Sequence, residues 1–138
     1  MSLAALRHPR GRDMAQVSIK AARATISAPV PFRGAQEAWF WTMAALVARR
    51  EGSPRNVDGA GPPRPAMPED VLHCLDTLYR RRRIDLLHAR ILRIWGERGI
   101  APNLSWAAER NDARIWQEAL ERLEWPLRVK GIVTDQGK

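Results

Sequence analysis

Apolar residues recur at steps of three and four along residues 34–51, which is the spacing of one face of an α-helix. Gly52 follows the last of these positions, and Arg49 and Arg50 stand in the preceding turn. A glycine just after a helix and cations in its last turn are both typical of a helix C-terminus. The pattern therefore predicts a helix at 34–51.

This predicted helix carries more aromatic surface than one apolar face needs, because Trp39, Phe40 and Trp41 are consecutive. Either another element covers both sides of the helix, or its rings meet a partner. Aromatic residues are enriched among those that dominate protein interfaces. These three are therefore the candidate partner-binding residues, whereas Trp95 and Trp116 lie on apolar stripes and are predicted to be core.

A second region of helical spacing begins at Pro68, which suits a first turn and is followed by two acids. On one straight helix, the apolar stripe of residues 71–79 and that of residues 84–95 would point about 150° apart. One helix with one buried face cannot satisfy both stripes, so a break is predicted near Arg81–Ile84. Asp85 then lies in the first turn of the following helix. The two predicted helices run near 69–81 and 84–97.

A third helix is predicted near 111–124, with Asn111 or Asp112 as its cap. It is expected to end near Glu124, because Pro126 disfavours a helical conformation at the residue before it. Residues 127–133 are then predicted to form a short extended piece. Gly96 and Gly99 are expected to bracket the end of the preceding helix, with Pro102 beyond it.

These elements indicate one domain of mostly α class. The predicted fold is a compact three-helix core, helix-turn-helix-like, with a Trp-rich helix on its N-terminal side. In that arrangement the two helices of the helix-turn-helix are those predicted at 84–97 and 111–124. The predicted segments are a disordered basic tail (1–30), the Trp-rich amphipathic helix (31–51), a Pro/Gly linker (52–67), the helical core domain (68–133) and a tail (134–138). The composition of the tail overlaps with that of a transit peptide, and Met14 is an alternative start.

The net charge of +8 and the pI of about 11.1 permit an anionic partner such as nucleic acid. Residues 1–67 hold ten basic and four acidic side chains, a net +6, and residues 68–138 hold thirteen and eleven, a net +2. The charge thus lies mainly outside the better-patterned half, which disfavours a simple DNA-binding face there. Only three of the 23 basic residues are lysine, so compositional bias also contributes to the arginine excess.

Four arginines stand in a row, from Arg80 to Arg83. On one helix they would fan over roughly 300° and could not all face one phosphate track. Cations at a helix C-terminus are stabilising by about 0.3–1 kcal/mol each, which accounts for two of the four. A solvated turn and a phosphate-contacting turn both remain open. The candidate nucleic-acid-binding residues are Arg80, Arg81, Arg83, Arg90, Arg93, Arg110 and Arg114.

Other chemistry is weakly indicated. His73, Cys74 and His88 match no zinc spacing, so no metal site is predicted. Cys74 is expected to be a small core residue and His88 a packed histidine. There is no phosphate-binding glycine loop, and the acids near the C-terminus alternate with arginines as on a solvated face. We therefore expect a protein that is not an enzyme, needs no cofactor and has no membrane partner.

The stretches LYRRRRIDLLHARILRIWGERG and LERLEWPLRVKGIV resemble small alphaproteobacterial proteins of unknown function, and the likeness covers residues 31–133. The resemblance implies a cytoplasmic bacterial protein but supplies no activity or site residue. Two functions follow from the residues. The first is a nucleic-acid-binding regulator, with DNA favoured over RNA, that uses a helix-turn-helix-like core and a flexible basic arm. The alternative is a helical protein-interaction module anchored at Trp39–Trp41; the oligomeric state stays open in both.

Overall fold

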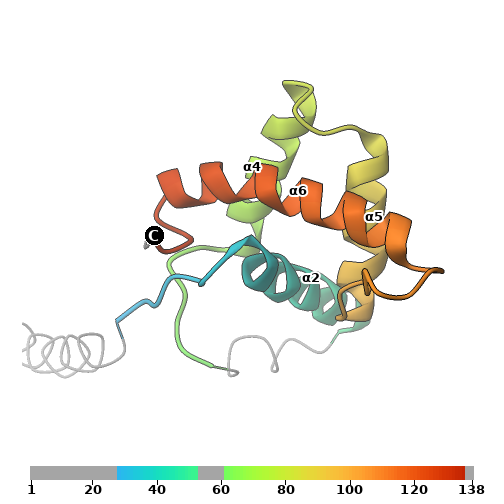
Figure 1. Ribbon diagram of the computed structural model, residues 1–138. Helices are drawn as coiled ribbons and strands as arrows, with labels where there is room; N and C mark the ends of the chain where they lie inside the picture. Colours follow the sequence, from blue (N-terminus) through green and yellow to red (C-terminus); the bar gives the residue numbers. More distant parts are fainter. Residues whose placement is uncertain (1–27, 53–60, 136–138) are drawn as a thin grey trace, which may run out of the picture.

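The computed structural model describes residues 28–52 and 61–135 (Figure 1). Within these ranges the chain forms α2 (Ala35–Glu51), α4 (Pro68–Arg80), α5 (Leu86–Arg98) and α6 (Arg110–Val129), a compact all-α arrangement without a sheet. Helices α4 and α5 meet at a turn at the top of the molecule, and α6 crosses both of them while α2 lies beneath (Figure 1). The mostly α prediction is confirmed, as is the break that separates α4 from α5. None of the described helices is long and apolar enough to cross a bilayer.

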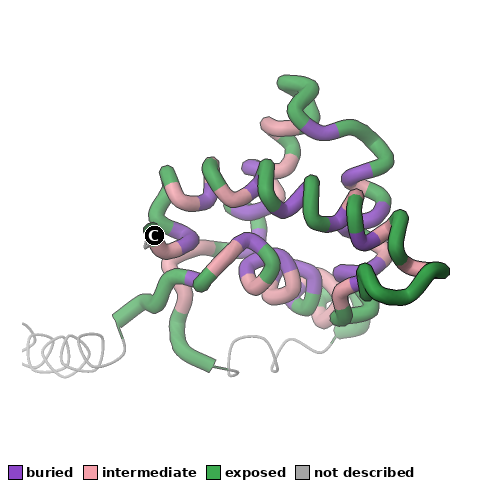
Figure 2. Tube along the Cα trace, in the orientation of Figure 1, coloured by how far each residue is buried: buried purple, intermediate pink, exposed green. Residues whose placement is uncertain are grey.

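Helix α2 is part of the core. It contacts α4, α5 and α6, and its inward positions are buried together with theirs (Figure 2). It ends as predicted, with Gly52 in the left-handed conformation at a φ of 73°. The core is therefore built from four helices, and the predicted division into a three-helix core and an added helix is too coarse. The amphipathic spacing predicted the helix, but it did not indicate how many other helices pack against it.

The prediction that Trp39 anchors a partner is wrong. Its side chain is only 2% exposed, and its Nε1 donates a hydrogen bond to the Leu92 carbonyl at 2.8 Å. Phe40 and Trp41 are half-buried and pack against the core as well. The aromatic excess of α2 is covered within the fold, by Trp116 over Phe40 at 5.4 Å and by Phe32 over Trp41 at 5.2 Å between ring centroids.

Helices α2 and α5 cross closely at Gly96. This glycine lies inside α5 and not at its end, contrary to expectation. A β-carbon on it would lie 2.6 Å from Trp39 Nε1 and 2.7 Å from Met43 Cγ, both well inside van der Waals contact. The missing side chain at Gly96 is therefore what admits the Trp39 indole. Gly99 does end α5, as predicted, at a φ of 73°.

The two ends of the described chain meet. Phe32 and Val133 form a parallel bridge, in which the Phe32 N–H donates to the Ile132 carbonyl at 2.9 Å and the Phe32 carbonyl accepts from Thr134 at 2.8 Å. The guanidinium of Arg64 covers the Phe32 ring at 4.3 Å. Arg64 and Ala66 of the predicted linker thus pack on the fold. Residues 53–60 of that linker and 1–27 of the predicted tail lie outside the described ranges.

Helix α6 runs through Pro126 to Val129, so the predicted end near Glu124 is wrong, and only the end of the predicted extended piece at 127–133, where Val133 bridges to Phe32, is extended. Proline inside a helix costs about 3 kcal/mol, because it removes an N–H donor and crowds the carbonyl four residues earlier. Leu123 and Leu127 lie on the same face one turn apart, and both are fully buried. Burying two leucines contributes about 3–6 kcal/mol, which offsets the proline.

The predicted caps of α6 are also wrong. The helix begins after Glu109, and no side chain caps it. Asp112 lies in the first turn and accepts a hydrogen bond from Trp95 Nε1 at 3.0 Å instead. A buried indole N–H needs a hydrogen-bond acceptor from the protein. The free N–H groups at an exposed helix N-terminus can donate to water instead.

Helix α4 ends in a Schellman turn, in which Arg82 N–H donates to the Tyr79 carbonyl at 3.0 Å and Arg83 N–H to the Leu78 carbonyl at 2.8 Å. This turn requires a left-handed residue, and Arg82 takes that role with a φ of 60°. Glycine usually holds this position because it has no β-carbon to crowd the backbone. The other described helices follow that rule, with Gly52, Gly99 and Gly131 after α2, α5 and α6.

Changing Arg82 to glycine is expected to stabilise the protein by about 1 kcal/mol. The substitution removes the cost of holding a residue with a β-carbon in the left-handed conformation. Part of this gain is lost, because glycine raises the conformational entropy of the unfolded chain. The measurement is urea unfolding of the full chain. Arg82→Ala is the matched control, because it removes the same charge but keeps the β-carbon. Equal stability of the two variants would show that the position is unstrained.

Candidate nucleic-acid interface

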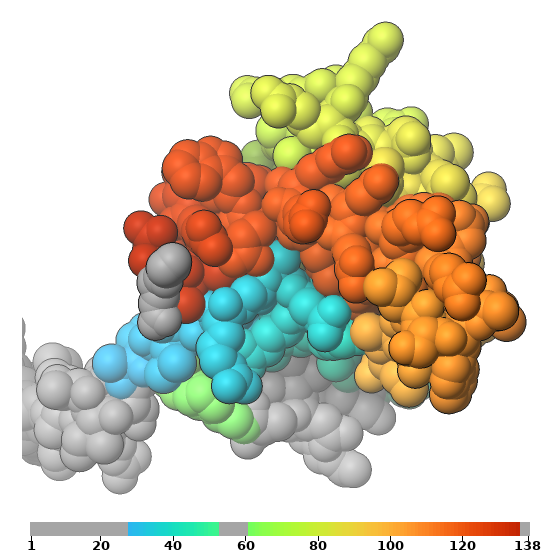
Figure 3. All heavy atoms as spheres, in the orientation of Figure 1, coloured from blue at the N-terminus to red at the C-terminus, as the bar shows by residue number. Residues whose placement is uncertain are grey.

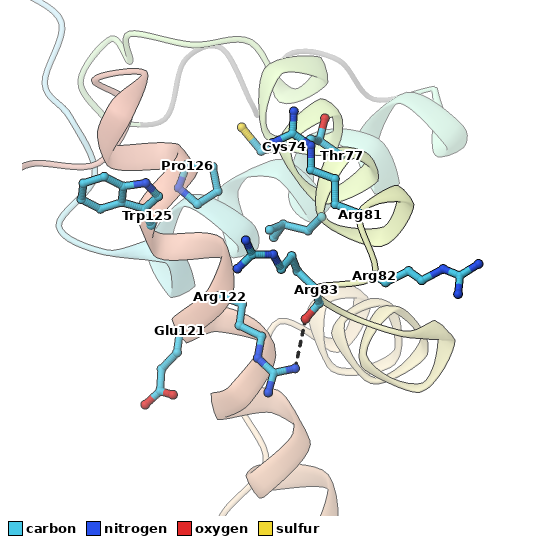
Figure 4. A pocket seen from close by; sticks show the side chains of 10 residues that line it. Cys74, Thr77, Arg81, Arg82, Arg83, Glu121, Arg122, Trp125 and Pro126 are labelled. Atoms are coloured by element: carbon cyan, nitrogen blue, oxygen red, sulfur yellow. Dashed lines mark hydrogen bonds between the residues drawn. The ribbon is translucent and has the colours of Figure 1, made fainter.

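A groove of about 700 Å³ lies between the C-terminal parts of α4 and α6 and the turn that follows α4 (Figure 4). Cys74, Leu78 and Pro126 give it an apolar floor, and the exposed ring of Trp125 stands on the α6 side. Figure 3 shows the turn between α4 and α5 standing out from the rest of the molecule. The basic residues of the groove are Arg81, Arg82, Arg83 and Arg122.

The turn that carries the arginines is fixed at both of its ends. Ile84 is buried between two exposed residues and so attaches the turn to the core. Asp85 caps α5, since its carboxylate accepts the N–H of Leu87 at 3.0 Å and of His88 at 3.2 Å. The backbone N–H of His88, helped by that of Leu87 and by the His88 ring, holds the pKa of Asp85 below its ordinary value. The cap is therefore ionised and intact near neutral pH.

His88 joins this cap to α6. Its Nδ1 lies 3.1 Å from the Asp85 backbone nitrogen and 3.0 Å from Asp85 Oδ1. Its Nε2 lies 3.0 Å from Glu118 Oε1 and donates to it. The imidazole is buried, which confirms the prediction of a packed histidine. One side chain thus ties the start of α5 both to its own cap and to the helix that forms the far wall of the groove.

The four arginines of the run differ in whether they have an acidic partner. Arg80 forms an ion pair with Asp76 one turn earlier, at 3.0 Å between Nε and Oδ2. Within the described residues, the guanidinium groups of Arg81, Arg82 and Arg83 form no ion pair or hydrogen bond. Arg122 donates from Nη1 to the Arg83 carbonyl at 3.1 Å and so bridges the two walls. Three adjacent cations thus have no acidic partner among the residues that the structure describes.

The close view separates these three cations by direction (Figure 4). The Arg81 side chain runs back along α4 toward Cys74 and Thr77, and the Arg83 side chain extends across the groove toward α6. The Arg82 side chain points away from both walls. Glu121, the acid that borders the groove, also turns its carboxylate away (Figure 4). The interior of the groove is therefore lined by positive charge.

The thiol on the floor of the groove, that of Cys74, is buried. Burial raises the pKa of Cys74, with a smaller contribution from Asp70, and Lys130 only partly opposes the rise. The thiol is therefore protonated near neutral pH, and thiolates are the reactive form. The prediction that Cys74 is a small core residue is confirmed. In the described part of the chain, no group of His, Cys, Asp and Glu side chains could hold a metal ion.

The predicted arginines do not form one surface. Arg81 and Arg83 both line the groove, whereas Arg93 lines a separate depression between α2, α4 and α5. Arg90 is exposed on α5 and does not border the groove. Arg110 and Arg114 are exposed at the other end of α6, and Arg110 lies about 18 Å along the helix axis from Arg122.

The sequence placed Arg122 on the third helix with Arg110 and Arg114 but not among the candidate site residues, and it left Trp125 out of the site altogether. Trp125 was expected beyond the end of the third helix, so it could not be placed beside Arg122. Once α6 continues, the two are three residues apart and lie on neighbouring parts of one face. The signal was present in Leu123 and Leu127, whose spacing indicates a helix that passes Pro126.

Any role of the groove has to be inferred from the residues that line it. The resemblance to small alphaproteobacterial proteins stays a prediction. Comparison of the chain with protein-family models, with curated proteins and with solved structures found no match.

Proposed function

We propose that the protein binds nucleic acid through this groove, with Arg81, Arg83 and Arg122 contacting phosphates. The observation that carries the proposal is the set of unpaired guanidinium groups on a turn that its neighbours hold in place. A guanidinium donates two parallel hydrogen bonds to one phosphate, which suits it to this contact. Adjacent unpaired cations repel one another, and a bound phosphate chain relieves that repulsion.

A purely structural role for the run accounts for fewer residues. The C-terminus of α4 favours nearby cations, but the effect fades within the last turn. Arg80 already lies there with Asp76 as its partner, and Arg81 directly follows the helix. Arg83 lies beyond the helix end and reaches over the groove (Figure 4). The dipole of α4 therefore does not explain Arg83.

The helix-turn-helix form of the regulator receives less support than the groove. Residues 99–109 connect α5 to α6, whereas the motif uses a turn of three or four residues. Two acids of α6, Asp112 and Glu118, are engaged with Trp95 and His88. We therefore assign binding to the groove and not to α6 as a reading helix. The basic residues of segment 1–30 then add affinity that does not depend on base sequence.

A salt series with two matched double variants tests the proposal. The full chain is titrated into labelled DNA, as a duplex and as a single strand, and affinity is followed by anisotropy. Arg81→Ala with Arg83→Ala removes two groove cations. Arg80→Ala with Arg90→Ala removes the same charge from an ion-paired residue and from an exposed residue that does not border the groove. The slope of log affinity against log salt should fall by about 0.7–0.9 for each groove arginine lost and stay nearly unchanged in the control.

Two results would contradict the proposal. One is the absence of binding by the parent chain at about 0.1 M salt, the range in which phosphate contacts still contribute strongly. The other is an equal loss of slope in the two double variants, because overall charge rather than the groove would then bind the DNA.

A second candidate function is protein interaction, and a surface other than the predicted anchor favours it. The connection between α5 and α6 exposes Ile100, Leu104 and Trp106, the last at 60%. Exposed apolar side chains of this size on one loop are typical of an interaction site. Failure of the parent chain to bind DNA in the salt series would favour this function over the first.

A further inference from the structure

Trp125 stands beside the basic groove with 68% of its surface exposed, more than any other large apolar residue in the described ranges. Tryptophan is highly buried on average, so such exposure is uncommon. The buried indoles of Trp39, Trp95 and Trp116 each donate a hydrogen bond. Among the described residues, Trp125 has no such bond and no ring contact. The part of the fold that the structure describes therefore holds this ring by no hydrogen bond or ring contact.

We infer that the groove takes single-stranded nucleic acid, and that one base stacks on Trp125 while neighbouring phosphates contact Arg81, Arg83 and Arg122. The inference rests on the proposed function and names the form of nucleic acid bound. Proteins that bind single strands combine a positive groove along the backbone with aromatic rings on which bases stack. In a duplex the bases are already stacked on one another and cannot lie on an external ring.

The arrangement of the groove places the two kinds of contact within reach of one strand. Arg122 and Trp125 are neighbours on α6, with their β-carbons about 5–6 Å apart as for any pair three residues apart on a helix. Arg83 extends across the groove toward α6, and the bond between Arg122 and the Arg83 carbonyl fixes that wall relative to α6, while the Trp125 ring lies along the outer side of α6 (Figure 4). Pro126 adds an apolar surface next to the ring. A backbone that follows the arginines therefore brings a base to Trp125.

The test separates stacking from any other role of the ring. The affinity of the full chain is measured for a single-stranded oligonucleotide and for an abasic strand of equal length, which keeps the phosphates but has no bases. Trp125→Ala should weaken binding to the base-containing strand by about 5- to 150-fold, the contribution of one stacked base. On the abasic strand the same variant should bind as the parent does. Trp125→Phe should keep most of the affinity, because it retains an aromatic face.

Trp106→Ala is the matched control, because it removes the other strongly exposed tryptophan, far from the groove in sequence. We expect it to leave both affinities unchanged, and we expect the parent to prefer the single strand to the duplex. Equal effects of Trp125→Ala on the two strands, or no preference over duplex, would overturn the inference while the salt series still upholds nucleic-acid binding. Absence of binding to every strand would overturn both. If the Trp125 ring binds a protein partner and not nucleic acid, the chain should bind none of the strands.

Discussion

Replacing Trp39 with alanine is expected to destabilise the protein by about 3–5 kcal/mol, the range for a large aromatic residue removed from a core. Its side chain is 2% exposed, lies over Gly96 and donates to the Leu92 carbonyl. Truncation leaves a cavity between α2 and α5 that the two helices cannot close without shifting. Small domains are stable by only about 5–15 kcal/mol in total, so the variant should be partly unfolded on mild denaturation. Urea unfolding followed by circular dichroism measures the change.

Trp106→Ala is the control for this experiment too, because its side chain is 60% exposed. A surface change of that kind should stay within about 0.5 kcal/mol of the parent. A loss of less than 1 kcal/mol in Trp39→Ala would contradict the structure. It would mean that α2 does not pack as described, and the interpretation of Trp39 as a partner anchor would return.

The helices themselves could be predicted because their signals are local. Apolar spacing, Gly52, Pro68 and Asp85 mark the body or the ends of α2, α4 and α5, and each acts through residues within one or two turns. The break after α4 could be predicted for the same reason, since two stripes about 150° apart cannot face one core.

The end of α6 could not be predicted from the local rule. A proline disfavours a helical conformation at the residue before it, and on this ground the helix was predicted to end before Trp125. What overrides it is the burial of Leu127, which depends on elements far away in the sequence. Tertiary burial outweighs a local preference when the two differ by a few kcal/mol. An error at this one residue also removed Trp125 from consideration as part of a site.

The groove could be predicted only in part. The run Arg80–Arg83 was visible, and the pairing of Arg80 with Asp76 follows from their spacing on a helix. Which of the other arginines face α6 depends on the packing of α4 against α6, some 40 residues apart, and no periodicity encodes it. The aromatic run on α2 misled for the same reason, because Phe32 and Trp116 cover it from distant parts of the chain.

The groove also depends on the helices beneath it. Its walls are α4 and α6, and α2 packs against both of them as well as against α5. Phosphate contacts need cations held in place, since an ordered side chain loses less entropy on binding than a free one. A change that separates α2 from α5 should therefore loosen the turn between α4 and α5 on which the arginines are carried.

Changing Gly96 to alanine is such a change, and we expect it to destabilise the protein by about 1–3 kcal/mol. On propensity alone alanine would stabilise a helix by about 0.8–1 kcal/mol relative to glycine, so the sign is informative. The new β-carbon would meet Trp39 Nε1 at 2.6 Å, and that indole is held by its bond to Leu92. Urea unfolding of the full chain gives the change in stability.

A double-mutant cycle with Trp39→Phe shows whether the clash is the cause. Phenylalanine lacks the indole nitrogen that the new β-carbon would strike, so Gly96→Ala should be less destabilising in that background than in the parent. Equal effects in both backgrounds would place the strain elsewhere, with Met43 as the remaining close neighbour. A stabilising effect of Gly96→Ala in the parent would mean that α2 and α5 do not approach as closely as the structure shows, because only free space at Gly96 lets helix propensity decide the outcome.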